Sequence, residues 1–299
     1  MAATVVNGTK KSGGFFGSMA NPVIRKMEKK AEYADASCST YGGIAGKTIF
    51  FLVVTIVGVL GYLALHNILI STTANVFHAV PTDEGGIYDL TMTMTDIIIV
   101  AAAVLISLIT PFLAWLIRPT IPVTGTLYAL AQGIVVGFIT TALRSDLKWI
   151  SLLAAVLTVM LVGAMLFVYA KRIIKVTARF RGIIFALFAT IVLSGILLFI
   201  LNLIPATRNL MSGVNQIMNN PIVSILLSVV FIIIASLFML ADFDTIERCV
   251  TNKMDKKYEW MAAWGLAYTI LYVYFKILRL LLMIFGKSKG GSSKSGSSF

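Results

Sequence analysis

The chain has 299 residues, of which 58% are hydrophobic and only 13% are charged, and its mean hydropathy is +0.91. This composition is too apolar for a water-soluble globular protein, so the main solvent of the chain must be lipid. The net charge of +12 does not require a nucleic acid partner, because most basic residues fall in segments that we predict to be cytoplasmic, where anionic lipid balances them.

The two ends of the chain differ in composition from its middle. Residues 1–45 are polar, basic and interrupted by Gly and Ser, and they lack the continuous apolar region of a signal peptide. We expect them to form a cytoplasmic arm. Residues 287–299 are a low-complexity sequence of Gly, Ser and Lys, which predicts a disordered tail.

Residues 46–286 are expected to form the membrane domain. An apolar segment of about 20 residues crosses the hydrocarbon core of a bilayer as a helix. Seven such segments follow one another: Lys47–Ile70, Met94–Ile117, Thr124–Leu143, Trp149–Ala170, Gly182–Leu203, Ile222–Asp244 and Glu259–Phe285. The sequence therefore predicts an all-α integral membrane protein, a bundle of seven transmembrane helices.

The distribution of Lys and Arg predicts the orientation of the bundle. Seven of them occur up to Lys47, and none occurs in the first loop, residues 71–93. Because Lys and Arg in short loops stay on the cytoplasmic side, we predict a multi-pass protein with a cytoplasmic N-terminus. Seven crossings place the lysines of the tail outside. We accept this conflict because the charge rule depends mainly on the early segments.

No catalytic residue is predicted, and we do not expect an enzyme. Neither His66 nor His78 lies in a metal-binding motif, and no nucleophile and base pair is visible at membrane depth. Cys38 and Cys249 both fall on the reducing side, so no disulfide is expected. Lys276 lacks the counter-ion that a chromophore-bearing lysine needs, and we expect its side chain to extend toward an interface.

Three carboxylates end the sixth segment, in "FMLADFDTIERCV" (residues 238–250), directly after an uncharged run. Such groups mark either a hydrated helix end or a functional site. On a helix Asp244 and Glu247 share a face, whereas Asp242 points about 200° away from Asp244. One carboxylate face can therefore look inward.

Several motifs resemble the Bax inhibitor family, the transmembrane Bax-inhibitor-motif proteins, in its bacterial YccA-like branch. "DFDTIE" is followed by a basic connector and by "LAYTILYVYFKILRLL". "NPV" at 21–23, "YGGIAGKT" at 41–48 and "LYALAQGIVVG" at 127–137 extend the resemblance over most of the chain. The resemblance implies a bacterial plasma membrane protein whose seventh helix is central and surrounded by the other six.

The aromatic residues of the last segment fit this central position. Trp264, Tyr268 and Tyr272 recur at i and i+4 spacing and so share one helix face. Aromatic and small residues all round a membrane helix suit burial against other helices better than exposure to lipid. We expect this aromatic face to pack inside the bundle.

The resemblance also implies a proton-sensitive calcium leak, in which an aspartate of the sixth helix and one of the seventh share a proton. Asp244 matches the first aspartate, but Thr269 stands in place of the second, and Gln132 stands where many relatives have Glu. We therefore expect Asp244 to face Thr269 and the bundle interior, and Asp242 to face headgroups or a neighbouring loop. Neither replacement titrates. We therefore expect a flat or acid-shifted response between about pH 6 and 8, because a lone carboxylate has no partner with which to share a proton.

Two functions remain open. The first is a calcium or cation leak gated at the inner rim by Asp244, a weak calcium ligand, with Arg118 or Arg279 as its closing partner. Calcium is then the transported ion, and no cofactor is expected. The second is a non-conducting regulatory membrane protein that binds a membrane protease or stress-response partners. The replacement by Thr269 favours the second function, and the intact "DFDT" favours the first.

Overall fold

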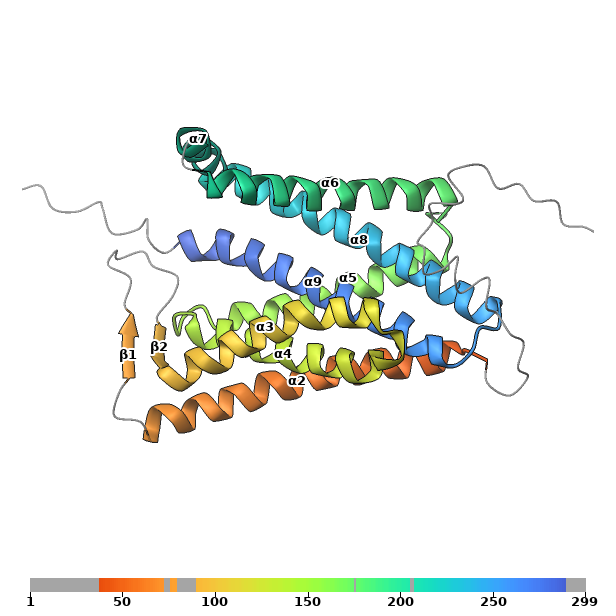
Figure 1. The fold of residues 1–299 in the computed structure, drawn as a ribbon, viewed down its shortest axis with the longest axis horizontal. Helices are drawn as coiled ribbons and strands as arrows, with labels where there is room; N and C mark the ends of the chain where they lie inside the picture. The colour runs from red at the N-terminus through yellow and green to blue at the C-terminus, as the bar shows by residue number, and fades with distance from the viewer. Residues whose placement is uncertain (1–37, 73–75, 80–89, 175, 205–206, 289–299) are drawn as a thin grey trace, which may run out of the picture.

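The structure is a computed structural model that describes residues 38–72, 76–79, 90–174, 176–204 and 207–288 (Figure 1). Most of the predicted cytoplasmic arm and nearly all of the predicted tail lie outside the described residues. The first described helix begins at Tyr41 and the last ends at Ser288, so the helical domain extends slightly beyond the predicted limits of 46 and 286 at both ends.

Seven long helices dominate the fold, as the hydropathy of the sequence predicts. They are α2 (Tyr41–Thr72), α3 (Met94–Leu116), α4 (Ile121–Ala142), α5 (Trp149–Ala170), α6 (Ala178–Leu203), α8 (Pro221–Thr251) and α9 (Lys257–Ser288). Each contains a stretch long and apolar enough to cross a membrane. The prediction of an all-α membrane bundle is confirmed. Helices α2 and α8 run about two turns past the predicted apolar segments, because their polar ends continue the helix.

Shorter elements join these helices. Strands β1 (Val76–Ala79) and β2 (Leu90–Thr93) form an antiparallel hairpin between α2 and α3, and the turn η2 (Arg118–Thr120) leads into α4. Helix α7 (Arg208–Asn219) precedes α8. Figure 1 shows the hairpin and α7 at the same end of the bundle. We call this the hairpin end, and we call the opposite end, where α2 begins, the Tyr41 end.

Helix α9 occupies the centre of the bundle, as predicted. It packs against α2, α4, α5 and α8. In the most apolar stretch of α9, 56% of the residues are buried inside the protein, which is the largest share among the seven long helices. Helix α3 packs mainly on α4, and α6 packs on α8 and α7 at the edge of the bundle (Figure 1). Four helices, and not six, therefore form the immediate surroundings of α9.

The aromatic face of α9 is only partly buried, contrary to prediction. Trp264 and Tyr268 both contact the ring of Tyr128 on α4, with centroid separations of 6.3 and 5.5 Å. Tyr268 nevertheless remains 42% exposed. The fully buried positions of α9 include Ala263 and Val273. The inner face of α9 therefore combines small residues with the ring of Tyr274, which is 7% exposed, and excludes the ring of Tyr268.

Helices α2 and α4 approach each other through glycines. A Cβ atom on Gly58 would lie 2.6 Å from the carbonyl oxygen of Leu130, and one on Gly133 would overlap the carbonyl oxygen of Thr55. No larger residue fits at either position without displacing a backbone. The contact therefore requires glycine at both positions, and small residues at such contacts are typical of closely packed membrane helices.

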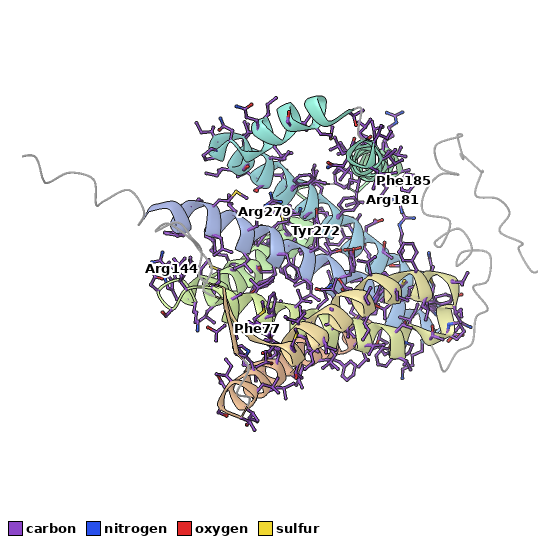
Figure 2. All side chains as sticks on the ribbon, turned by 60° about the vertical axis from the view of Figure 1, so that its left-hand side comes forward. Phe77, Arg144, Arg181, Phe185, Tyr272 and Arg279 are labelled. Atoms are coloured by element: carbon purple, nitrogen blue, oxygen red, sulfur yellow. The ribbon has the colours of Figure 1, made fainter. Side chains whose placement is uncertain are left out.

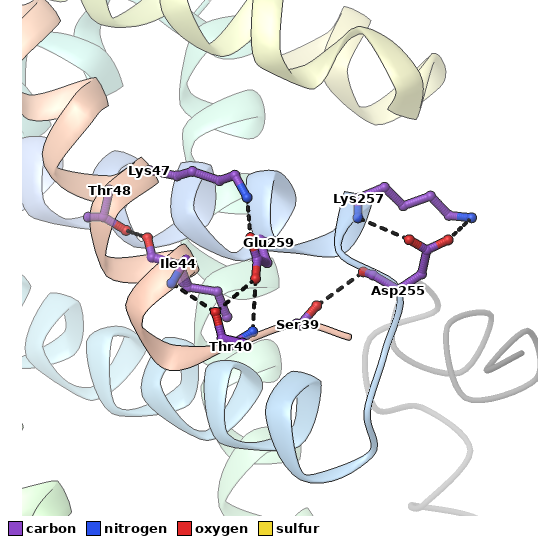
Figure 3. Close-up of polar contacts among 9 residues, drawn as sticks. Ser39, Thr40, Ile44, Lys47, Thr48, Asp255, Lys257 and Glu259 are labelled. Atoms are coloured by element: carbon purple, nitrogen blue, oxygen red, sulfur yellow. Dashed lines mark hydrogen bonds and ion pairs between the residues drawn. The ribbon is translucent and has the colours of Figure 1, made fainter. Parts of the chain in front are cut away.

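Glu259 anchors the beginning of α9 to α2 (Figure 3). Its carboxylate is fully buried, pairs with the Lys47 ammonium and accepts a hydrogen bond from the backbone N–H of Thr40 at 2.8 Å. The same ammonium lies 5.2 Å from the centroid of the Trp260 ring. A buried carboxylate with these partners is satisfied, and it fixes the position of α9 at the Tyr41 end.

The connector between α8 and α9 is held by the chain that precedes α2. The Ser39 hydroxyl donates to the carbonyl oxygen of Asp255 at 3.0 Å. The side chain and backbone N–H of Lys257 donate to the carboxylate of Asp255 (Figure 3), and these bonds lower the pKa of that carboxyl group below its ordinary value.

Candidate functional site

Asp242 and Asp244 point to opposite sides of α8, as their spacing predicts. The two sides are exchanged relative to the prediction: Asp242 faces α9, and Asp244 faces α6. The Thr269 hydroxyl of α9 donates to Oδ2 of Asp242 at 2.6 Å. The prediction that Asp244 faces Thr269 is therefore wrong. Ala235, Met239 and Asp242 recur at i, i+4 and i+7, and this is the face of α8 that meets the core.

The carboxylate of Asp242 has a hydroxyl partner and, among the described residues, no cationic partner. It is half-buried, and it lies about 14 Å along the helix from the end of α8 at Thr251. In the part of the chain that the structure describes, no Lys or Arg pairs with it, and Thr269 is its hydrogen-bond partner. A carboxylate at this depth is costly, so Asp242 is a candidate functional group.

Asp244 is bound by two arginines. Its Oδ2 accepts a hydrogen bond from Nε of Arg248 at 2.9 Å and lies 3.3 Å from Nη1 of Arg181 on α6. The side chains of Arg181 and Asp244 are only 12% and 13% exposed. The two guanidinium groups oppose a metal ion at this carboxylate, so Asp244 does not fit the role of a calcium ligand.

Glu247 lies on the same face as Asp244, as their spacing predicts. It accepts a hydrogen bond from the Tyr169 hydroxyl and lies 3.7 Å from Nη2 of Arg172. Both carboxylates line a cavity of about 480 Å³ at the Tyr41 end. Its other lining residues are Tyr169, Arg172, Ile174, Val176, Arg248, Thr251 and Asn252. Within the described ranges, no three His, Cys, Asp or Glu residues gather in a way that suits a metal ion.

The remaining predicted site residues lie elsewhere. Arg118 begins η2 at the Tyr41 end. Arg279 is exposed on the half of α9 nearer the hairpin end (Figure 2), far from Asp244. Gln132 lies one turn after Tyr128, on the part of α4 that contacts α9. The structure therefore assigns the arginine partners of Asp244 to Arg181 and Arg248.

The sequence analysis missed Arg181 because it is distant from Asp244 along the chain. Figure 2 shows it near the start of α6, one turn before Phe185. The sequence did contain a signal for this pairing: an arginine at the beginning of an apolar segment, at the same depth in the predicted membrane as the end of α8. Charges at equal depth on adjacent helices tend to pair, because pairing lowers the cost of burying both.

A separate polar cluster lies at the hairpin end. Nδ1 of His66 on α2 lies 3.2 Å from Oδ1 of Asp96 on α3, and both side chains are buried. The other oxygen of Asp96 accepts the backbone N–H of Thr93 at 2.9 Å, and the Thr93 hydroxyl accepts the N–H of Asp96 in return. This capping box begins α3, so the cluster holds α2, α3 and the hairpin together.

Polar side chains also lie along the contact between α8 and α9. Nζ of Lys276 lies 4.4 Å from the ring centroid of Phe231 on α8 and 5.0 Å from that of Tyr272. The lysine was expected to extend toward an interface, but its ammonium lies over these rings. Phe231 and Asp242 are three helical turns apart and share one face. We call this contact the α8–α9 seam, formed by Phe231, Asp242, Thr269, Tyr272 and Lys276.

No curated protein and no solved structure matches the chain. A family model described as Bax inhibitor 1 like matches residues 21–286, which include all seven membrane-spanning windows. The YccA-like branch stays a prediction. With seven apolar helices, a central α9 and a match over most of its length, the chain belongs to the Bax inhibitor 1 like family of membrane proteins.

Proposed function

We propose that the protein is a leak pathway for calcium or another cation, and that the ion binds at Asp242. The observation that supports this most is the half-buried carboxylate of Asp242 at the α8–α9 seam. Its partner is a hydroxyl group, and among the described residues no Lys or Arg side chain neutralises it. Carboxylate and hydroxyl oxygens are the hard ligands that calcium prefers.

The Asp244 cluster has a positioning role in this proposal. Asp242 and Asp244 are about 200° apart around α8. The ion pair of Asp244 with Arg181 holds one side of the helix toward α6, and the pair with Arg248, which lies within α8, fixes the direction of the Asp244 carboxylate. They thereby hold Asp242 toward α9 and Thr269.

The proposed membrane is the bacterial plasma membrane, with the N-terminus in the cytoplasm. The Tyr41 end is then cytoplasmic, in agreement with the basic residues of the connectors around 171–181 and 248–257. A proton shared between two carboxylates is not part of the proposal, because the group that faces Asp242 is the hydroxyl of Thr269.

Calcium flux into proteoliposomes that contain an indicator dye tests the proposal. The unmodified protein should raise the flux well above that of protein-free vesicles, and Asp242→Asn should reduce it about tenfold or more by removing the bound ion's counter-charge. Asp255→Asn is the matched control, because Asp255 lies in the α8–α9 connector and outside the seam. Flux no higher than in protein-free vesicles would reject the leak. The alternative would then be a non-conducting regulatory protein that binds a membrane protease or stress-response partners.

A further inference from the structure

Lys276 places a positive charge in the α8–α9 seam between Asp242 and the hairpin end. It follows Thr269 by two turns of α9, about 10 Å along the helix axis. The side chain is half-buried, and the ammonium is held over the faces of Phe231 and Tyr272, one ring from each helix. Aromatic faces attract cations, so these rings fix the charge in the seam.

Within the described ranges, no carboxylate balances the charge of Lys276, and its ammonium contacts the two aromatic rings. Arg279, another cation, lies one turn further toward the hairpin end and repels the Lys276 ammonium. Figure 2 shows Arg279 further toward the hairpin end of α9 than Tyr272, which lies near the middle of the helix. A cation that moves along the seam between the hairpin end and Asp242 therefore meets the positive charge of Lys276.

We propose that Lys276 is a charge barrier that restricts cation passage along the seam and determines which cations pass. The inference rests on the proposed leak and adds a selectivity-determining residue to it. The repulsion that an ion meets is proportional to its charge, and it is strong in a site from which water is largely excluded. The barrier therefore opposes calcium more than a monovalent ion.

Three substitutions separate the charge of Lys276 from its packing. Lys276→Met removes the charge and keeps an unbranched apolar side chain against the rings. Lys276→Arg keeps the charge. The matched control is Lys171→Met, because Lys171 also lies beside an aromatic ring, 5.9 Å from the centroid of Phe167, but at the Tyr41 end and outside the seam.

Calcium and potassium fluxes should be measured on the same proteoliposome preparations. Lys276→Met should increase calcium flux about tenfold and potassium flux by a smaller factor, because the removed repulsion is twice as large for the divalent ion. Lys276→Arg and Lys171→Met should keep the fluxes of the unmodified protein. Size-exclusion chromatography checks folding. Should Lys276→Met fail to fold, Phe231→Leu, which removes a ring that holds the ammonium, should still raise the calcium-to-potassium ratio.

The outcomes distinguish the barrier from the leak itself. An unchanged calcium flux in folded Lys276→Met, together with loss of flux in Asp242→Asn, would overturn the barrier and leave the leak standing. An equal increase for both ions would also overturn it, because a loosened helix contact does not discriminate by charge. Flux in neither the unmodified protein nor Lys276→Met would reject the leak, and the barrier with it.

Discussion

Asp242 and Asp244 are separated by one residue but differ in the charges around them. Asp244 lies between Arg181 and Arg248, whereas the partner of Asp242 is the neutral hydroxyl of Thr269. A buried ion pair is costly to break because the remaining charge stays in a poorly solvated site. We therefore expect substitution of Asp244 to affect mainly stability, and substitution of Asp242 to affect mainly ion passage.

The first prediction concerns Asp244→Asn. It should destabilise the folded protein by about 3 kcal/mol, because the largely buried Arg181 loses a carboxylate. Thermal unfolding in detergent measures this as a lower Tm. Adding Arg181→Gln to Asp244→Asn should recover part of the loss. A Tm reduction no larger than that of Asp255→Asn, in the exposed connector, would contradict the assignment.

The second prediction concerns Thr269→Asp. Because Oγ1 of Thr269 lies 2.6 Å from Oδ2 of Asp242, the substitution places two carboxylates close enough to share a proton. Calcium flux should then fall more steeply from about pH 8 to 6 than in the unmodified protein. Thr269→Val is the control, since it removes the hydroxyl and adds no titratable group. An identical pH profile for all three proteins would show that position 269 does not face the ion-binding carboxylate.

The sequence predicted relative directions of side chains better than their partners. Helical spacing correctly indicated that Asp244 and Glu247 share a face and that Asp242 points away. Spacing gives no absolute rotation, however, so it left open which face meets α9. That rotation is decided by the packing of Ala235 and Met239 and by the distant Arg181, neither of which the local pattern contains.

At the scale of elements, hydropathy located the seven long helices but not the shorter structures. Helix α7 has 12 residues, and each hairpin strand has four, so neither reaches the length of a membrane span. The hydropathy pattern therefore did not distinguish helix α7 and the hairpin strands from loops. The close contact of α2 with α4 was also missed, because a glycine in a helix indicates close packing only when its neighbour is known.

The third prediction tests that contact with Gly133→Ala. The added methyl group overlaps the backbone of α2, so the helices must separate, at a cost of about 2 kcal/mol. The measurement is again the Tm in detergent. Gly61→Ala on α2 is the matched control, because a Cβ atom there meets nothing within 4 Å. Similar Tm values for the two variants would refute the close approach.

At the scale of the whole molecule, α9 combines the anchoring and the functional contacts. Glu259 and Lys47 fix its Tyr41 end, and its middle carries Thr269 and Lys276 in the seam with α8. The central position was implied by the family resemblance, and it agrees with the small buried residues of α9. The family match gives no ion and no direction of transport, so these belong to the proposed function.

The fourth prediction concerns orientation. In a chain with Cys38→Ser and Cys249→Ala, a cysteine introduced at Lys253 should react with a membrane-impermeant thiol reagent only from the cytoplasmic side. One introduced at Ser71 should react only from outside. Both positions are exposed, at the Tyr41 end and the hairpin end respectively. The reversed labelling pattern would show that the charge rule fails for this protein.

The central claim is that Asp242, and not Asp244, is the carboxylate through which ions pass. The most direct measurement is calcium flux in proteoliposomes for two proteins, Asp242→Asn and the double variant Asp244→Asn with Arg181→Gln, which removes one charge of each sign from the Asp244 cluster. We predict flux near the level of protein-free vesicles for Asp242→Asn and most of the unmodified flux for the double variant. Normal flux in Asp242→Asn, with loss of flux in the double variant, would contradict the account.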